Sequence, residues 1–415
     1  MPATLSAADL SQPDVIANPY PYYAALRERS PIFGYEDYPP GTIPGQDVPR
    51  PAWAMLRYAD VQQVCREHEI FSSRDEMQEQ SAGTTLMLVN HDRPYHGILR
   101  AMASKAFTAA RIASLTAWMT QTVSRMLDDE PMHDGEFDFM RNLAPELPAR
   151  VMCRLMGVPE ADYRDIRRWA NAFMVTAEND DGTPLSPAVR QQCNREVDAY
   201  FTAAVDTRLA DLARGVSLPD DLITAFIEAE ENGQRLSREE VIRFCVTLVV
   251  AGAETTTYYL GNLLGYLVEM PALFTQLQAD RALLRPFMEE AARHSGPVQR
   301  LHRVCVRDTE VGGVPIKAGD WVAIFFAAAN RDPAVFERPD EFLLTRPNAN
   351  RHLTFSHGIH YCMGANLARL ECETMINAFF DRGRALEPGR SPARRQTGGS
   401  LNYGFATLPL RLMPR

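Results

Sequence analysis

The sequence lacks the features that mark secreted, membrane-spanning and nucleic-acid-binding proteins. Its seven cysteines follow no regular spacing, which argues against a disulfide framework and indicates reduced thiols. The longest apolar run, residues 244–253, contains Thr247 and stops at Glu254, short of the roughly 18 residues of a membrane helix. No basic segment followed by an apolar one, as in a signal peptide, opens the chain. A formal net charge of −10 argues against nucleic acid as a partner. We therefore expect a soluble, cytoplasmic protein that binds neither nucleic acid nor a membrane.

Helical periodicity dominates what is present. With 415 residues, 46% of them hydrophobic, the chain can form a large core. Apolar residues recur at helical spacing over 21–29, 59–66, 94–157, 162–178 and 186–212. Short β-type runs occupy 53–58, 309–317, 321–326, 404–407 and 410–413. Polar stretches at 72–83 and 179–184 predict loops. These patterns predict a mainly α protein with minor β structure.

The longest predicted helix begins at a capping box. Ser237 stands at the N-cap and Glu240 follows three residues later, so that each side chain can satisfy a backbone N–H group of the other. Apolar residues continue to about Glu269, and Pro271 then ends the helix. The sequence therefore predicts one helix of about eight or nine turns near the middle of the chain.

Three residues inside this helix break the rules for a buried helix. Gly252 costs about 1 kcal/mol relative to Ala, and the carboxylate of Glu254 is expensive to bury unless it is paired. The hydroxyl of Thr255 competes for backbone carbonyls and bends helices. Local rules broken together at one place indicate a functional site. The alternative is a kinked core helix whose threonines bond back to the backbone.

A single cysteine stands between two glycines near the C-terminal end. Cys362 lies between Gly358 and Gly364, and apolar residues at helical spacing follow at once. The N–H groups at a helix N-terminus favour the thiolate, which is a metal ligand or a nucleophile. A buried structural cysteine and a zinc site are the alternatives. Zinc is disfavoured because the nearby histidines do not form the paired clip of a structural zinc site.

The pattern Phe-x-x-Gly-x-His-x-Cys-x-Gly, at Phe355, Gly358, His360, Cys362 and Gly364, resembles the haem-ligand loop of the cytochrome P450 family. The members of this family are haem-thiolate monooxygenases, and the absence of a membrane anchor resembles the bacterial soluble type. The resemblance implies haem b (iron protoporphyrin IX) as the cofactor, with Cys362 as the axial ligand of its iron and Phe355, His360 and Gly364 in contact with it.

The resemblance covers about residues 19–411, with Ser356 at a position where the family more often has Gly. It implies the cytochrome P450 fold, in which a long central helix passes over the haem beside a small β-rich lobe. A single domain would span residues 1–415. The lobe would comprise approximately residues 1–70, 300–330 and 395–415, and the helical lobe the remainder.

The segment around Glu254 resembles the oxygen-activation motif of the same family. In that motif Gly252 leaves space for dioxygen, Thr255 donates a hydrogen bond to the oxygen that is being activated, and Glu254 relays protons from solvent. An acid and an alcohol side by side suit this role, because cleaving the O–O bond requires two protons.

Cationic side chains complete the implied haem site. His96 and Arg100 lie four residues apart on one predicted helix face. With Arg303 and His360 they resemble the residues that hold the haem propionates in the family, a role that suits the bidentate pairing of arginine with carboxylates.

A predicted ion cluster precedes this site in the chain. Glu290 and Arg293 lie three residues apart and can pair on one helix face. Such a pair is usually solvated and contributes little to stability. The resemblance instead makes Glu290, Arg293 and Arg346 a structural cluster that braces the cysteine loop.

The implied reaction inserts one oxygen atom of O2 into a hydrophobic small molecule, by hydroxylation or epoxidation. Electrons from NAD(P)H would arrive through an external ferredoxin and its reductase, because the chain is too short to include a reductase domain. The ferredoxin would dock near the cysteine loop, where Arg100 and Arg369 offer positive charge, and the protein would be a monomer. A peroxide-driven peroxygenase, a non-enzymatic haem-binding protein and a structural protein without cofactor are the alternatives.

Substrate contacts are predicted above the haem. The expected pocket residues are Val249, Val250, Ala253, Val298, Leu301 and Asn402. Arg300 and His302 are expected to add polar contacts. Apolar residues of this kind suit a plain core equally well.

Overall fold

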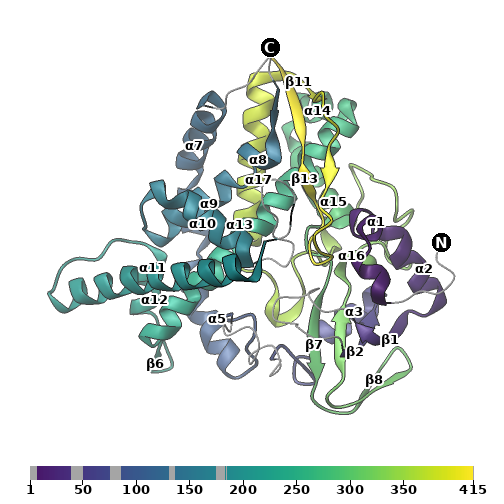
Figure 1. Cartoon of the computed structure of the whole chain (residues 1–415), viewed down its shortest axis with the longest axis horizontal. Helices are drawn as coiled ribbons and strands as arrows, with labels where there is room; N and C mark the ends of the chain where they lie inside the picture. Colours follow the sequence, from purple (N-terminus) through teal and green to yellow (C-terminus); the bar gives the residue numbers. More distant parts are fainter. Residues whose placement is uncertain are drawn as a thin grey trace.

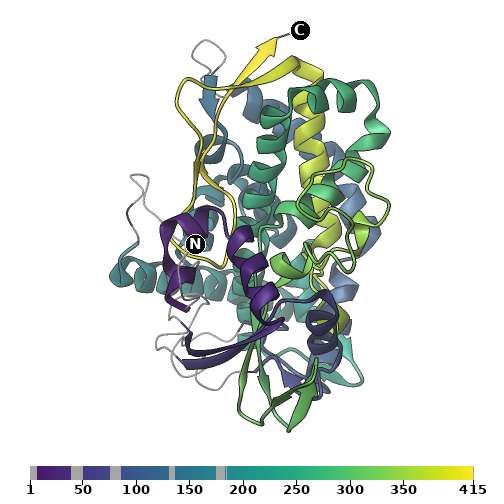
Figure 2. The same cartoon turned by 90° about the vertical axis from the view of Figure 1, so that its right-hand side faces the viewer.

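Helices make up most of the molecule, and the main sheet lies at one edge beside the N-terminal helices (Figures 1 and 2). The computed structural model describes residues 7–38, 50–74, 86–129, 136–173, 183 and 185–414. The predicted mainly α fold with minor β structure is confirmed.

The central element is α13 (Arg238–Glu269), the predicted long helix. Its capping box is present: the Ser237 hydroxyl accepts from the N–H of Glu240, and the Glu240 carboxylate accepts from the N–H of Ser237. Pro271 opens the next helix, α14 (Pro271–Ala279). Because α13 contacts helices on several sides, most of its side chains are buried. The predicted bounds of this helix are confirmed.

The remaining helices surround α13 or cover the sheet. They are α1 (Pro13–Ala17), α2 (Tyr20–Arg29), α3 (Tyr58–Arg66), α5 (Tyr95–Ala106), α6 (Ala109–Ser114), α7 (Thr116–Asp129), α8 (Phe139–Asn142), α9 (Glu146–Met156), α10 (Tyr163–Phe173), α11 (Pro187–Ala213), α12 (Leu222–Glu228), α15 (Leu284–Ser295), α16 (Phe326–Ala329) and α17 (Ala365–Arg382). Among these, α9, α10, α11, α15 and α17 pack against α13. Short 3-10 helices include Ala349–Arg351 and Gly358–His360, on either side of residue 355.

The main sheet has five strands in the order β1 (Ile32–Tyr38), β2 (Arg50–Met55), β10 (Trp321–Ile324), β7 (Leu301–Cys305) and β3 (Phe71–Ser72). Strand β10 pairs parallel to β2 and antiparallel to β7. A second sheet orders β11 (Gly383–Pro388), β14 (Pro409–Pro414) and β4 (Glu136–Asp138). Three two-stranded sheets join β5 (Glu230–Glu231) to β6 (Gln234–Arg235), β8 (Thr309–Val311) to β9 (Val314–Ile316), and β12 (Arg394–Arg395) to β13 (Phe405–Thr407).

The longest of the strands that were not predicted from the sequence are β1, β7 and β11. Each lacks a clean alternation of apolar and polar residues. The register of β1 shifts between Tyr35 and Tyr38, and β7 buries His302 and Arg303 next to each other. The strand predicted at 53–58 ends at Met55, because Tyr58 already begins α3. The predicted loops at 75–83 and 179–182 lie outside the described residues, as do residues 174–178 of the helix predicted over 162–178.

A fully buried ion cluster ties α15 to residues 330–346. Arg293 donates to both carboxylate oxygens of Glu290 at 2.8 Å, and Nε of Arg346 lies 3.0 Å from both oxygens. The remaining N–H groups of the two arginines bond to the backbone carbonyls of Asn330, Glu337, Arg338, Pro339 and Glu341. The structure therefore brings together the three residues of the predicted cluster. Burial of these charges is tolerated because every one has a partner.

Glu290→Gln is expected to lower the free energy of unfolding by about 3–5 kcal/mol, because it leaves two buried guanidinium groups without their charge partner. Glu341→Gln is the control, since the Glu341 carboxylate pairs with Arg338 at 3.0 Å on the surface and should contribute less than about 1 kcal/mol. Urea unfolding of both variants measures the difference. Equal losses in the two variants would contradict the importance of this cluster.

Candidate active site around Cys362

The cysteine loop, residues 355–364, has two residues in the left-handed region. Ser356 has φ of 64° and Gly358 has φ of 70°. A Cβ atom on Gly358 would lie 2.5 Å from the backbone oxygen of Cys65 in α3, so only glycine fits there. The N–H of Cys362 donates to the carbonyl of Phe355 at 2.8 Å, which closes the loop. The loop therefore delivers Cys362 to the start of α17 in a tightly defined conformation.

The sulfur of Cys362 meets the N-terminus of α17. Burial raises the pKa of the Cys362 thiol, while the N–H groups of Gly364 and Ala365 and the charges of Arg100 and Arg369 lower it. The protein around the thiol thus desolvates it and also offers positive charge to the thiolate. The Cys362 side chain is nevertheless exposed, whereas the other six cysteines are buried. An accessible thiol with these neighbours suits metal ligation better than a structural role.

Four cationic or imidazole side chains cluster beside Cys362. The rings of His96 and His360 lie 4.4 Å apart, and Nε2 of His360 lies 2.8 Å from the Ser73 hydroxyl. Burial, helped by neighbouring positive charges, lowers the pKa of His360 to about 2 and that of His96 to about 4. Burial also lowers the pKa of Arg100 and Arg303.

No carboxylate forms an ion pair with Arg100 or Arg303 in the part of the chain that the structure describes. Nε2 of His96 is also buried without a hydrogen-bond partner. Desolvated positive charge without a counter-charge is unfavourable by itself, so this cluster fits a ligand that brings carboxylates. The two propionates of haem are such groups, and the residues present therefore fit haem.

One face of α13 remains partly open in an otherwise buried helix. Leu248, Ala251 and Thr255, spaced by three and four residues, all keep some exposed surface. Sequence reasoning expected substrate contacts from residues 246–254 but did not single out Leu248 and Ala251, which counting back from Thr255 by helical spacing would have identified. The Thr255 hydroxyl donates to the carbonyl of Ala251 at 2.8 Å. The back-bonded threonine that the sequence left as an alternative is therefore present here.

Gly252 is explained by packing. A Cβ atom at this position would approach the Met152 sulfur of α9 to 3.1 Å, closer than nearly all such contacts. The close approach of α9 and α13 thus requires a small residue. Gly252 lies beside the open face, and a side chain at this position would point toward α9.

Glu254, two residues after Gly252, is only 7% exposed. Burial raises the pKa of its carboxyl to about 7, and the charge of Arg167 on α10 partly offsets this increase. A carboxyl with such a pKa exchanges its proton near neutral pH. Desolvation therefore causes the raised pKa of Glu254, and the charge of Arg167 does not cancel this effect.

Helix α13 is joined to the cysteine loop by an aromatic contact. Tyr259, one turn after Thr255, has its ring 6.4 Å from that of Phe355 and donates to the Met288 carbonyl at 2.7 Å. Phe355 in turn accepts the hydrogen bond from Cys362. This short chain of contacts holds Thr255 and Cys362 on neighbouring elements.

The family model "Cytochrome P450" matches residues 183–411. A putative cytochrome P450, YjiB, from Bacillus subtilis is 34% identical over 370 residues, 87% of each chain. A steroid C26-monooxygenase from Rhodococcus jostii is 31% identical over 403 residues, 94% of this chain and 82% of that protein. CYP109E1 from Bacillus megaterium, solved in complex with testosterone, is 29% identical with a TM-score of 0.80, over 95% of this chain and 99% of that one. This chain belongs to the cytochrome P450 family.

Membership confirms the predicted family, its fold and its class of activity: the protein is a haem-dependent monooxygenase. The cationic cluster around His360 and the accessible thiol of Cys362 agree with the haem that this P450 requires. Among the described residues, no helix of this P450 is long and apolar enough to cross a membrane.

The predicted pocket residues of this P450 divide into two groups. Val298 forms a β-bridge with Asn402, and Leu301 shares a face of β7 with Arg303 of the cationic cluster. Val250 on α13 is 5% exposed, and helical spacing places it about as far from the open face as Val249.

The other predicted pocket residues point elsewhere. Val249 and Ala253 are almost fully buried, on the side of α13 opposite Leu248 and Thr255. Arg300 donates to the Ser400 carbonyl at 2.9 Å. His302, on the same face of β7 as Arg300, packs on Trp321 with their ring centroids 4.8 Å apart. None of these four side chains lies on the open face of α13 that Leu248, Ala251 and Thr255 form. That they contact substrate stays a prediction.

Arg369 also differs from its prediction. It is only 6% exposed, and its guanidinium bonds to Glu289 in the interior. The prediction that Arg369 presents positive charge on a docking surface is therefore wrong. Single charged residues in an amphipathic helix such as α17 carry no sequence signal that separates a buried partner from an exposed one.

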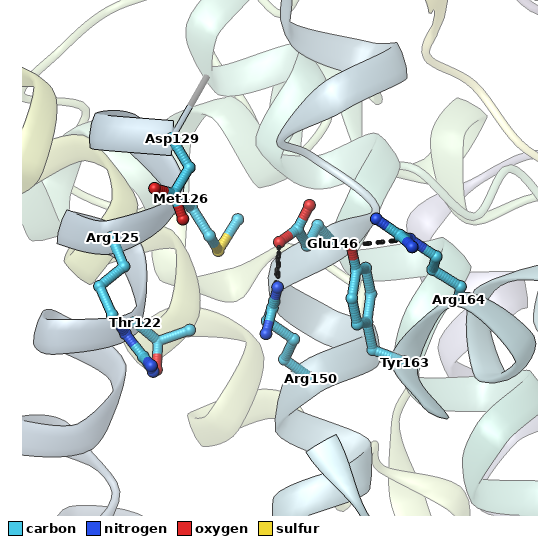
Figure 3. Close-up of a pocket in the computed structure, with 8 residues that line it drawn as sticks. All are labelled: Thr122, Arg125, Met126, Asp129, Glu146, Arg150, Tyr163 and Arg164. Carbon is cyan, nitrogen blue, oxygen red and sulfur yellow. Dashed lines mark hydrogen bonds and ion pairs between the residues drawn. The ribbon is translucent and has the colours of Figure 1, made fainter. Parts of the chain in front are cut away.

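A separate pocket of about 290 Å³ opens between α7, α9 and α10 (Figure 3). Arg150 in its wall donates to Glu146 at 2.7 Å and to Glu160 at 2.6 Å, and lies over the ring of Tyr163. The pocket contains none of the predicted site residues. The charge of Arg150 is thus satisfied within the protein.

Gly358→Ala is expected to destabilise this P450 more than Gly313→Ala. Both glycines have positive φ, but a Cβ atom at Gly313 would meet open space. Gly313→Ala should therefore lose only about 1–2 kcal/mol of unfolding free energy from left-handed strain. Gly358→Ala adds the clash with Cys65, roughly 1–3 kcal/mol more. Urea unfolding and haem content measure the difference, and equal losses would show that the loop does not depend on this close approach.

Glu254→Gln is expected to remove a pH dependence of stability. Because the pKa of Glu254 is raised from 4.5 to about 7 in the folded protein, the folded state binds more protons than the unfolded state between these values. The stability due to this proton is fully present below pH 4.5 and is lost as the pH rises through about 7. The wild type should therefore lose about 3 kcal/mol relative to Glu254→Gln across this window.

Urea unfolding on both sides of the window measures this effect. Glu239→Gln is the control, because the Glu239 side chain is 72% exposed on the same helix and its removal should leave the wild-type pH dependence in place. If the curves of Glu254→Gln and wild type ran parallel in pH, the raised pKa of Glu254 would be refuted.

Proposed function

We propose that this P450 inserts one oxygen atom of O2 into a hydrophobic small molecule, by hydroxylation or epoxidation, with Cys362 as the axial ligand of its haem iron. The observation that carries the proposal is the accessible thiol of Cys362 at the N-terminus of α17, beside two imidazoles and two arginines that have no carboxylate partner among the described residues. When bound, haem supplies the activation of O2 and the transfer of oxygen, chemistry that a thiolate ligand favours.

The proximal residues hold the cofactor and its charge. The N–H groups of Gly364 and Ala365 stabilise the thiolate of Cys362. Four side chains beside Cys362 hold the haem propionates: His96, Arg100, Arg303 and His360. Phe355 closes the loop through its carbonyl, and Gly358 allows the loop to approach α3.

The residues of α13 deliver protons. Glu254, with a pKa of about 7, takes a proton from solvent and releases it near neutral pH. The Thr255 hydroxyl donates to Ala251 at 2.8 Å, and by rotating it can donate toward the open face instead. Gly252, which precedes both residues by two and three positions, presents no side chain to α9.

Substrate binds on the open face of α13, against Leu248 and Ala251, with Val298, Leu301 and Asn402 on the facing segments. Apolar side chains dominate this set, which suits a hydrophobic small molecule. One relative is a steroid C26-monooxygenase and one structural neighbour was solved with testosterone, so steroids are the first probes for a screen by spin-state shift.

Electrons come from NAD(P)H through a separate ferredoxin and its reductase. We further propose one domain over residues 1–415, acting as a monomer. The Glu290 cluster, with Arg293 and Arg346, maintains the fold in which haem is incorporated.

Cys362→Ser is expected to abolish the Soret band at the thiolate position in the reduced, CO-bound protein, because a serine hydroxyl does not ionise at this pH to replace the thiolate. Cys372→Ser is the matched control, since Cys372 is buried in α17, the helix that follows Cys362. It should keep the band, at some loss of stability. A wild-type protein without the band, or a Cys362→Ser protein that retains it, would overturn the proposed ligand.

A further inference from the structure

Glu289, the residue before Glu290 in α15, is the centre of a second ion cluster. Its carboxylate accepts two hydrogen bonds from Arg369 of α17, from Nε at 2.8 Å and from Nη2 at 3.0 Å. Nε2 of His352 lies 3.1 Å from the same carboxylate. Arg285, whose side chain is 56% exposed, approaches it from the surface at 2.7 Å. Arg369 and His352 are buried, so Glu289 joins a buried cluster to the surface.

The two buried partners lie on either side of the cysteine loop. His352 comes three residues before the loop, and Arg369 comes seven residues after Cys362. A single carboxylate therefore holds both ends of the loop. Arg369 also lies over the ring of Phe355 at 4.3 Å, which fixes the guanidinium against the first residue of the loop.

The Glu290 cluster reaches the loop only indirectly. Its arginines bond to residues 330–346, and the connection continues through Asn330. The Asn330 side chain accepts from the N–H of Leu353 at 2.6 Å and donates to the Thr354 hydroxyl at 2.9 Å. The neighbouring carboxylate, Glu289, thus has the direct contact with the elements that flank Cys362.

The charge state of the second cluster follows from its hydrogen bonds. The N–H of Thr354 donates to Nδ1 of His352 at 3.2 Å, so Nδ1 is an acceptor and Nε2 carries the hydrogen that is donated to Glu289. Burial lowers the pKa of His352, which keeps the ring neutral. Burial acts to raise the pKa of Glu289, but the hydrogen bonds from His352 and Arg369 lower it to about 2. The buried pair is therefore a charged Glu289 and a charged Arg369.

We propose that Glu289 and Arg369 are positioning residues that hold the cysteine loop so that the sulfur of Cys362 meets the haem iron in one orientation. This inference rests on the proposed role of Cys362 as the iron ligand. The bidentate pair restrains both distance and angle between α15 and α17. A lysine in place of Arg369 keeps the charge but neither the planar fork nor the stacking on Phe355.

The test compares ligation in the reduced, CO-bound holoprotein of Arg369→Lys and Glu289→Gln with that of the wild type. The readout is the ratio of the Soret band at the thiolate position to the band of protein without thiolate ligation. We expect the ratio to fall about tenfold in both variants, the effect of losing one buried charged hydrogen bond. Arg285→Gln is the control, because Arg285 pairs with the same carboxylate from the surface, and it should keep the wild-type ratio.

A double variant distinguishes positioning from loss of charge balance. Glu289→Gln/Arg369→Gln removes both buried charges and leaves two amides that can bond to each other, so it should recover part of the ratio lost in Glu289→Gln. If Arg369→Lys lowered thermal stability yet kept the wild-type ratio, the pair would be a brace of the fold alone and the inference would be overturned. A wild type without the thiolate band would instead overturn the ligand itself. Should Glu289→Gln fail to fold, Arg369→Lys alone decides.

Discussion

A thiol inside a protein is harder to ionise than one in water, and the structure around Cys362 is arranged against that tendency. Burial raises the pKa of this thiol, whereas two backbone N–H groups at the start of α17 and the charges of Arg100 and Arg369 lower it. The fold brings these groups, which are distant in the sequence, close to the thiol. The turn at Gly358 that fits only glycine brings the sulfur to the helix end, and the ion clusters of α15 keep that helix and the loop in place.

Two consecutive glutamates of α15 bind partners on different sides of one helix. Glu290 faces residues 330–346 and binds two arginines, while Glu289 faces α17 and the residues before the loop. Successive residues of a helix point about 100° apart, so one turn of α15 can bind both neighbours. Since each carboxylate has its own arginine partners, neither cluster depends on the carboxylate of the other.

The sequence predicted those features that depend on neighbouring residues or on a family pattern. The capping box at Ser237 and the helix that follows it were predicted to the residue, and the partners Glu290, Arg293 and Arg346 do meet. Side-chain direction was the weak point. Arg369 was placed on a surface that it does not face, because packing of distant elements decides which side of a helix is open. Strands such as β7, which bury charged residues, showed no alternation to find.

On both sides of the site, burial shifts pKa values, and the partners of each group decide how far the shift goes. On the side of Cys362, Arg100 and Arg303 have no carboxylate partner among the described residues, and burial lowers the pKa of both. On the side of α13, Glu254 is desolvated with only the charge of Arg167 against it, so its pKa rises to about 7. A carboxylate placed among the cations would be held ionised and could not carry protons, whereas Glu254, kept away from them, can. The separation of these two environments is what lets one fold bind an anionic cofactor and supply protons close to it.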